Sequence, residues 1–115
     1  MDRSTQLSSL VSSLERLASI LRLDPGCRWT AAFESCLDRA KALQNGSATQ
    51  NDLNSLSATL MSFFGGAGSF NDYGPGTYDP VSGKYSTPRG MDNLESVSTE
   101  VHDKALALRA IGDAI

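Results

Sequence analysis

The sequence predicts an all-α protein, a single bundle-like domain of four helices with a long glycine-rich loop between the third and fourth helices. Three observations predict this class. Leucines near the N-terminus recur at the spacing of one helix face, three further apolar stripes follow, and the glycine-rich segment FFGGAGSFNDYGPG (63–76) separates the last two stripes. A chain of 115 residues buries roughly two-thirds of its unfolded surface, so residues 1–115 are expected to fold as one domain without metals or disulfides.

The first expected helix contains a run of leucines spaced alternately by three and four residues, with Val11 and Ala18 beside them. The leucines are Leu7, Leu10, Leu14, Leu17 and Leu21. This spacing also suits a coiled coil, but it lasts only two heptads, so a core helix of a bundle is favoured. A homo-oligomeric adaptor joined through this helix is kept as an alternative.

The second expected helix covers residues 23–46. Asp24 is placed to cap it, and Pro25 suits the first helical position, where its missing N–H costs nothing. Asn45-Gly46 predicts a left-handed stop. The apolar stripe is Trp29, Ala32, Phe33, Cys36, Leu37, Ala40 and Leu43.

The third expected helix starts at Asn51 or Asp52 and ends at Gly65-Gly66. Its apolar side is Leu53, Leu56, Leu60, Met61 and Phe64. The fourth is expected to begin with a capping box formed by Asp92 and Glu95. Its apolar side is Leu94, Val97, Val101, Ala105 and Leu108, and it continues toward Ile111, with Gly112 after it.

Residues 65–91 connect these two helices and exceed the roughly 12–15 residues beyond which a structureless loop is uncommon. Such a loop is usually functional or disordered. Within it, TYDPVSGKYST (77–87) has the composition of a small β-hairpin, with Asp79-Pro80 opening the turn and Gly83 at positive φ. Tyr78 and Tyr85 then flank the turn.

The charge distribution argues against nucleic-acid binding. The net charge is −3, and residues 42–83 contain no lysine or arginine. An acidic middle favours a basic partner instead. No apolar stretch approaches the roughly 20 residues needed to span a bilayer, and the N-terminus lacks the apolar core of a secretory signal, so a cytoplasmic location without membrane contact is expected.

The glycines of the connection raise the question of phosphate binding. A Walker loop ends in Gly-Lys-Ser/Thr and leads into a helix, whereas here a helix precedes Gly65, Gly66 and Gly68, no lysine follows, and Asp72 would repel a phosphate. The three glycines are therefore interpreted as a structural turn. No cofactor is expected.

Short polar side chains surround an aromatic residue in the segment that follows. Ser69, Asn71 and Asp72 readily bond to nearby backbone. Phe70 among them either plugs into the helices, which is favoured, or is displayed to a partner.

Cys27 and Cys36 are expected to be reduced thiols, with Cys36 in the core and Cys27 near a helix start. Nucleophilic catalysis with His102 lacks a recognisable surround, and one histidine with two separated cysteines makes no metal site. Trp29 is interpreted as a core residue, although Trp and Arg28 together are also typical of an interface anchor.

The chain resembles a family of small, largely uncharacterised bacterial helical proteins whose shared signature is a Gly-Gly-x-Gly-Ser-Phe-Asn-Asp turn after a helix. The resemblance covers roughly residues 7–72 and, less closely, the final helix; residues 73–91 depart from it. Its motif residues are Gly65, Gly66, Gly68, Ser69, Phe70, Asn71 and Asp72. The resemblance implies a fold more than an activity, and it points by association to toxin-immunity proteins.

The expected function is a non-enzymatic protein-binding domain, most concretely an immunity protein. Its acidic surface and loop are expected to occlude the active site of a cognate toxin, whose own surface is expected to be basic. The protein is expected to be a monomer or weak dimer. The expected partner-binding residues are Ser69, Phe70, Asn71, Asp72, Tyr73, Tyr78 and Asp79. The alternative to the binding domain and to the adaptor is a small enzyme or ligand-binding protein that uses the Gly65–Asp72 turn and His102.

Overall fold

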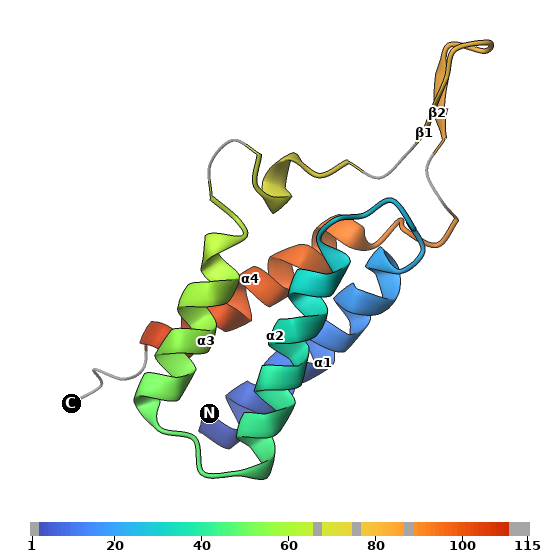
Figure 1. The fold of residues 1–115 in the computed structure, drawn as a ribbon. Coiled ribbons are helices and arrows are strands. Elements are labelled where there is room, and N and C mark those ends of the chain that lie inside the picture. Colours follow the sequence, from blue (N-terminus) through green and yellow to red (C-terminus); the bar gives the residue numbers. More distant parts are fainter. Residues whose placement is uncertain (1–2, 66–67, 75–76, 87–88, 111–115) are drawn as a thin grey trace.

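The computed structural model describes residues 3–65, 68–74, 77–86 and 89–110 (Figure 1). Its helices are α1 (Arg3–Leu21), α2 (Thr30–Asn45), α3 (Gln50–Ser62) and α4 (Leu94–Ala110). A single 3₁₀ turn, η1 (Phe70–Asp72), and two short strands, β1 (Thr77–Asp79) and β2 (Lys84–Ser86), lie between α3 and α4. The predicted all-α class and helical bundle are confirmed.

Consecutive helices run in opposite directions around one core (Figure 1). α1 packs against α2 and α4, and α3 packs against the same two helices from the other side. This is the arrangement of an up-and-down four-helix bundle.

The predicted leucine face of α1 forms the centre of the core. Leu10, Leu14, Leu17 and Leu21 are completely buried, and they meet Phe33 of α2, Leu56 of α3 and Val101 of α4 in one hydrophobic cluster. Because these leucines pack inside their own chain, they are not available as an interface for an adaptor. Cys36 lies in the same core, and both cysteines are free thiols, as predicted.

The start of the second helix was predicted too early. α2 begins at Thr30, and residues 24–27 form a turn in which Gly26 N donates to Asp24 Oδ1 (3.0 Å). Asp24 thus bonds to the backbone two residues on, as Asp and Asn do in Asx turns, rather than capping a helix. The predicted left-handed stop is also wrong, because Gly46 has extended backbone (φ −124°).

The third helix begins slightly earlier than predicted. Thr49 is its N-cap: its hydroxyl accepts from Asp52 N (3.1 Å), and the Asp52 carboxylate accepts from Thr49 N (3.0 Å). This reciprocal pair is a capping box. α4 begins at Leu94, two residues after Asp92, and Ile111 and Gly112 lie outside the described residues.

The description of residues 65–91 as one long glycine-rich loop is wrong. The segment contains η1, which packs on the bundle, and then β1 and β2. The physical reason is that Phe70 buries its ring while its polar neighbours satisfy the surrounding backbone, so this part of the connection has a defined structure of its own.

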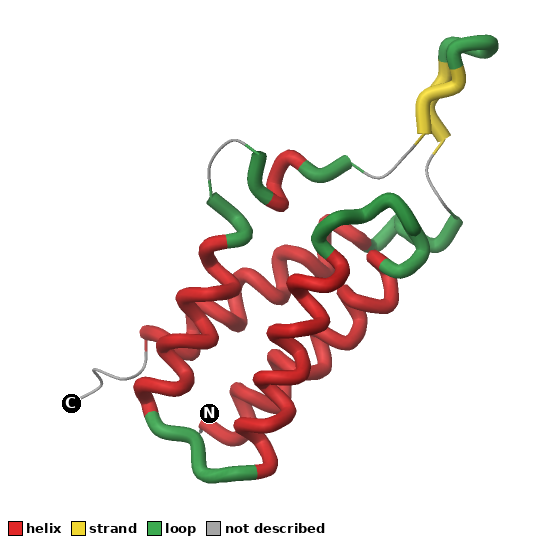
Figure 2. Tube along the Cα trace, viewed as in Figure 1, coloured by secondary structure: helices red, strands yellow, loops and turns green. Residues whose placement is uncertain are grey.

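β1 and β2 pair antiparallel, with Thr77 opposite Ser86, and Gly83 in their turn has φ +70°. Figure 2 shows the two strands projecting away from the helices. The projection gives the molecule extents of 59 × 26 × 20 Å and a radius of gyration of 15.7 Å, against roughly 13 Å for a compact domain of about this length. We refer to residues 77–86 as the projecting hairpin.

Candidate functional site

The turn that follows α3 closes onto the end of that helix. Phe70 N donates to the Phe63 carbonyl (2.7 Å), and the Asn71 side-chain amide donates to the Phe64 carbonyl. The last carbonyls of a helix have no partner within it, so these two bonds satisfy groups that the end of α3 leaves open. Ser69 is the N-cap of η1, and its hydroxyl accepts from Asn71 N (3.3 Å).

Gly68 is fixed through both of its backbone groups. Its N–H donates to Asp72 Oδ2 (2.6 Å), and its carbonyl accepts from the Arg28 guanidinium (2.7 Å). With φ +77°, Gly68 occupies the left-handed region, which a glycine adopts without the cost that a Cβ would bring. Gly68 lies in the turn where the sequence analysis placed it, Gly65 is exposed, and Gly66 lies outside the described residues.

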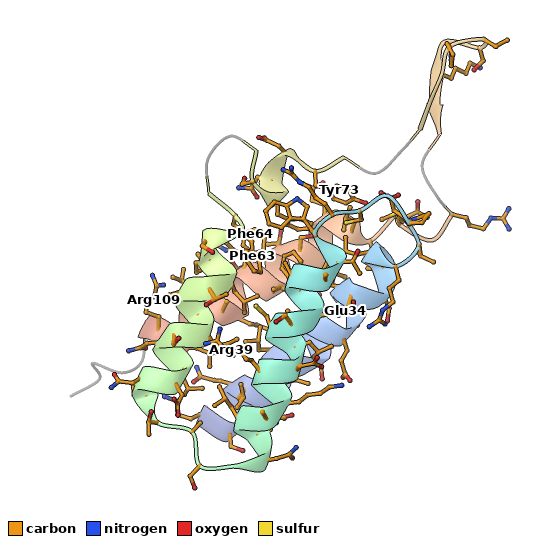
Figure 3. The ribbon with its side chains drawn as sticks, viewed as in Figure 1. Glu34, Arg39, Phe63, Phe64, Tyr73 and Arg109 are labelled. Carbon is orange, nitrogen blue, oxygen red and sulfur yellow. The ribbon has the colours of Figure 1, made fainter. Side chains whose placement is uncertain are left out.

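Phe70 is the centre of an aromatic cluster. Its ring lies 4.8 Å from that of Phe33, 5.6 Å from Phe64 and 5.9 Å from Trp29, each in a tilted or edge-to-face arrangement, and it stacks on Tyr73 at 5.8 Å. Such edge-to-face pairs add to the free energy gained by burial alone. Figure 3 shows Phe63, Phe64 and Tyr73 gathered at this end of the bundle.

Tyr73 ties the turn to the segment between α1 and α2. Its hydroxyl donates to Asp24 Oδ2 (2.6 Å). Burial, followed by the hydrogen bonds to Asp24 and Cys27, raises the pKa of the Tyr73 phenol far above its ordinary value, so the hydroxyl stays a donor. Residues far apart in the chain are thereby joined across the top of the bundle.

A groove of about 600 Å³ lies between η1 and the first half of α4. Its aromatic lining includes Phe64, Phe70 and Tyr73, and its α4 side includes the exposed carboxylates of Asp92 and Glu95. The other described lining residues are Asn71, Met91, Leu94, Ser98, Thr99 and His102. None of the lining residues that the structure describes is a lysine or arginine.

The hydroxyls of the groove are engaged as donors. Ser98 donates to the Leu94 carbonyl (2.7 Å) and Thr99 to the Glu95 carbonyl (3.0 Å). The His102 ring lies edge-to-face on Phe64 at 5.2 Å, and its Nδ1 is 3.0 Å from Asp103 Oδ1. Neither Cys27 nor Cys36 is among the described lining residues, and burial raises the pKa of Cys36, so its thiol is held in the protonated form.

A family model for a domain of unknown function (DUF6966) matches residues 22–80, just over half of the chain. The protein belongs to this family. The predicted membership of a largely uncharacterised family is confirmed. No curated protein and no solved structure matches the chain.

The DUF6966 segment contains every residue of the aromatic cluster and the Asp24–Tyr73 hydrogen bond. It also contains η1 and β1, but not α4. The turn of the groove therefore belongs to the family segment, whereas the acidic side of the groove lies outside it.

The structure divides the residues expected to bind a partner into three groups. Ser69 and Phe70 are buried, at 6% and 5% exposure, and hold the turn in place. Asn71 and Tyr73 line the groove. The others lie elsewhere: Asp72 is exposed but bonds within the turn, and Tyr78 and Asp79 belong to β1.

Sequence reasoning considered His102 together with the turn, and both line the groove, but it missed the carboxylates on the α4 side. Glu95, Thr99 and His102 recur at intervals of three or four residues, which places them along one face of α4, and Asp92 lies in the turn just before the helix. That spacing was readable, but it was used only to place a helix cap. Within the described residues, no group of three or more His, Cys, Asp or Glu is arranged to hold a metal ion, and no helix there is long and apolar enough to cross a bilayer.

Proposed function

We propose that this protein is a non-enzymatic protein-binding domain that neutralises a basic partner, most concretely a bacterial immunity protein for a cognate toxin. In this proposal the projecting hairpin enters a concave site on the partner, and the acidic surface beside the groove contacts the partner's basic surroundings.

The projecting hairpin is the observation that carries the proposal. An isolated two-stranded hairpin is marginally stable in water, and here it extends from the bundle with Val81 at 94% exposure in its turn. A narrow element of this kind contributes little to the core, but it has the shape to enter a cleft. Its open strand edges also offer backbone groups for pairing with another chain.

Charge supports the same proposal. Asp92 and Glu95 form no ion pair among the described residues, unlike Glu100 further along α4, which pairs with Arg16 (3.0 Å). Carboxylates of the groove lining that form no ion pair among the described residues would attract a basic protein and speed its association more than they set its affinity.

The test compares the full chain with a variant in which a Gly-Gly link replaces residues 78–85. Because Thr77 and Ser86 are paired neighbours, this link joins them without moving the bundle. We expect the full chain to capture a protein from its native cells that stops growth when expressed alone and is harmless when co-expressed. The shortened variant should keep the melting temperature of the bundle and lose both capture and protection.

Capture and protection by the shortened variant at full strength would show that the hairpin is not the interface. A captured protein that does not affect growth would contradict the immunity role and leave a binding domain of another kind.

A further inference from the structure

We propose that the groove between η1 and α4 receives an arginine side chain from the partner protein. The inference rests on the proposed function in one respect, which is that the occupant belongs to a protein partner. It names the chemistry of a second contact, separate from the projecting hairpin.

The aromatic lining is the first argument. The half-buried rings of Phe64 and Tyr73 line the groove, and the buried Phe70 stacks nearly parallel to Tyr73, with 15° between the two rings. A guanidinium is planar, weakly hydrated and stacks on aromatic rings, whereas an ammonium is compact and strongly hydrated. The lining therefore favours arginine over lysine.

The acceptor groups of the groove are the second argument. Asp92 and Glu95 supply carboxylates. The hydroxyls of Ser98 and Thr99 donate to helix carbonyls, so toward the groove their oxygens can only accept. Asn71 donates through its nitrogen to Phe64, which leaves its carbonyl oxygen to accept. A guanidinium has five N–H donors and no acceptor, so it complements such a set.

Size and charge agree with this occupant. A groove of about 600 Å³ is within the usual range of ligand sites and has room for the side chain and adjoining backbone of an extended segment. The described lining contains two carboxylates and no lysine or arginine; His102 also lines it, with Nδ1 3.0 Å from Asp103 Oδ1. Charge complementarity therefore selects a basic segment.

The experiment titrates the ¹⁵N-labelled full chain with a blocked Gly-Arg-Gly peptide, up to about 5 mM, above a millimolar dissociation constant. Peptides with citrulline or lysine in place of arginine are the controls. We expect the arginine peptide to shift the amide signals of Asn71, Glu95 and Thr99, and the citrulline peptide to shift none of them. Lysine should bind about fivefold more weakly.

A matched pair of variants tests the site. Glu95→Gln should weaken binding of the arginine peptide about fivefold, whereas Asp38→Asn, which removes one negative charge from an exposed position on α2 outside the groove lining, should leave it unchanged. Both positions are exposed, so both variants should fold.

Equal shifts with arginine and citrulline, shifts outside the groove, or no shift at 5 mM peptide would each overturn the inference. Equal binding of the lysine peptide would overturn the choice of a guanidinium. These failures are distinguishable from failure of the proposed function, because hairpin-dependent capture and protection are measured without the peptide and would persist if only the groove inference were wrong.

Discussion

The turn around η1 and the projecting hairpin come from the same connection between α3 and α4, yet they differ in their relation to the bundle. The turn is tied down by hydrogen bonds to Phe63 and Phe64, by the Arg28 contact to Gly68 and by the burial of Phe70. The hairpin strands pair with each other and project outward. The difference teaches that a glycine-rich sequence does not by itself decide whether a segment packs on the bundle or projects from it, since an anchoring aromatic side chain decides it here.

The largest effect is expected from removing an aromatic ring from the turn around η1. Phe70→Ala should lower the free energy of unfolding by about 3 kcal/mol, because it opens a cavity among Phe33, Phe64 and Trp29. Urea denaturation followed by circular dichroism measures the change. Val81→Ala, in the hairpin, is the control and should change it by less than about 0.5 kcal/mol. Equal effects at the two positions would break the comparison.

Removal of a single hydroxyl gives the next effect. Tyr73→Phe leaves the half-buried Asp24 carboxylate without its partner at 2.6 Å, and we expect a loss of about 1.5 kcal/mol, as for hydrogen bonds to charged groups. A double-mutant cycle with Asp24→Ala isolates the pair, because alanine has no oxygen to accept from Tyr73. Additive effects in that cycle would mean that the hydrogen bond does not hold the turn.

Two glycines with nearly the same backbone conformation sharpen the comparison. Gly68 (φ +77°) and Gly83 (φ +70°) would each be strained by a Cβ, at a cost of about 1 kcal/mol. Gly68→Ala should lower the melting temperature of the bundle, because the turn is coupled to the core. Gly83→Ala should strain only the hairpin and leave that temperature unchanged; a matching decrease would show that the hairpin is part of the cooperative unit.

The smallest expected effect concerns two carboxylates of α4, one with hydrogen-bond and ion-pair partners (Glu100) and one without an ion pair among the described residues (Glu95). The hydrogen bond from Ser13 (3.1 Å), helped by Arg16 and Lys104, lowers the pKa of Glu100 below its ordinary value. A carboxyl group with a lowered folded-state pKa adds stability above its unfolded pKa of about 4.3, and this stability is lost as the pH falls through the folded value. In the Glu100→Gln variant, the free energy of unfolding should therefore decrease less steeply below about pH 4 than in the unmodified protein.

The control for that measurement is Glu95→Gln, because Glu95 has no ion-pair partner among the described residues. The free energy of unfolding of this variant should decrease at acid pH as steeply as that of the unmodified protein. Stability against pH, measured by urea denaturation at each pH, separates the two variants.

Much of the bundle could be predicted from the sequence because burial follows helical periodicity. The leucines of α1, Cys36 and the valines of α4 lie in the core where their spacing put them. The start of α2 could not be predicted, because Asp24 and Pro25 suit both a helix cap and a turn, and the long-range bond from Tyr73 favours the turn. The defined structure of η1 was obscured by its glycines, since its order depends on Phe70 reaching a ring cluster assembled from α2 and α3.

The candidate site was predictable only in part. Asn71 and Tyr73 were identified from the turn, and His102 was considered with it. The carboxylates of Asp92 and Glu95 join these residues only through the packing of α4 against the turn, which their spacing in the sequence does not report. Burial also reassigned Ser69 and Phe70, because a residue in a polar, glycine-rich segment can still be the one that fills the core.

Trp29 is the only tryptophan of the chain, and its indole contacts both Phe63 and Phe70. The molecule therefore carries an intrinsic fluorophore at the contact between the turn and the helices. Its emission will report detachment of η1, while the helical ellipticity reports loss of the bundle, so the two events can be timed separately in one sample without an added dye.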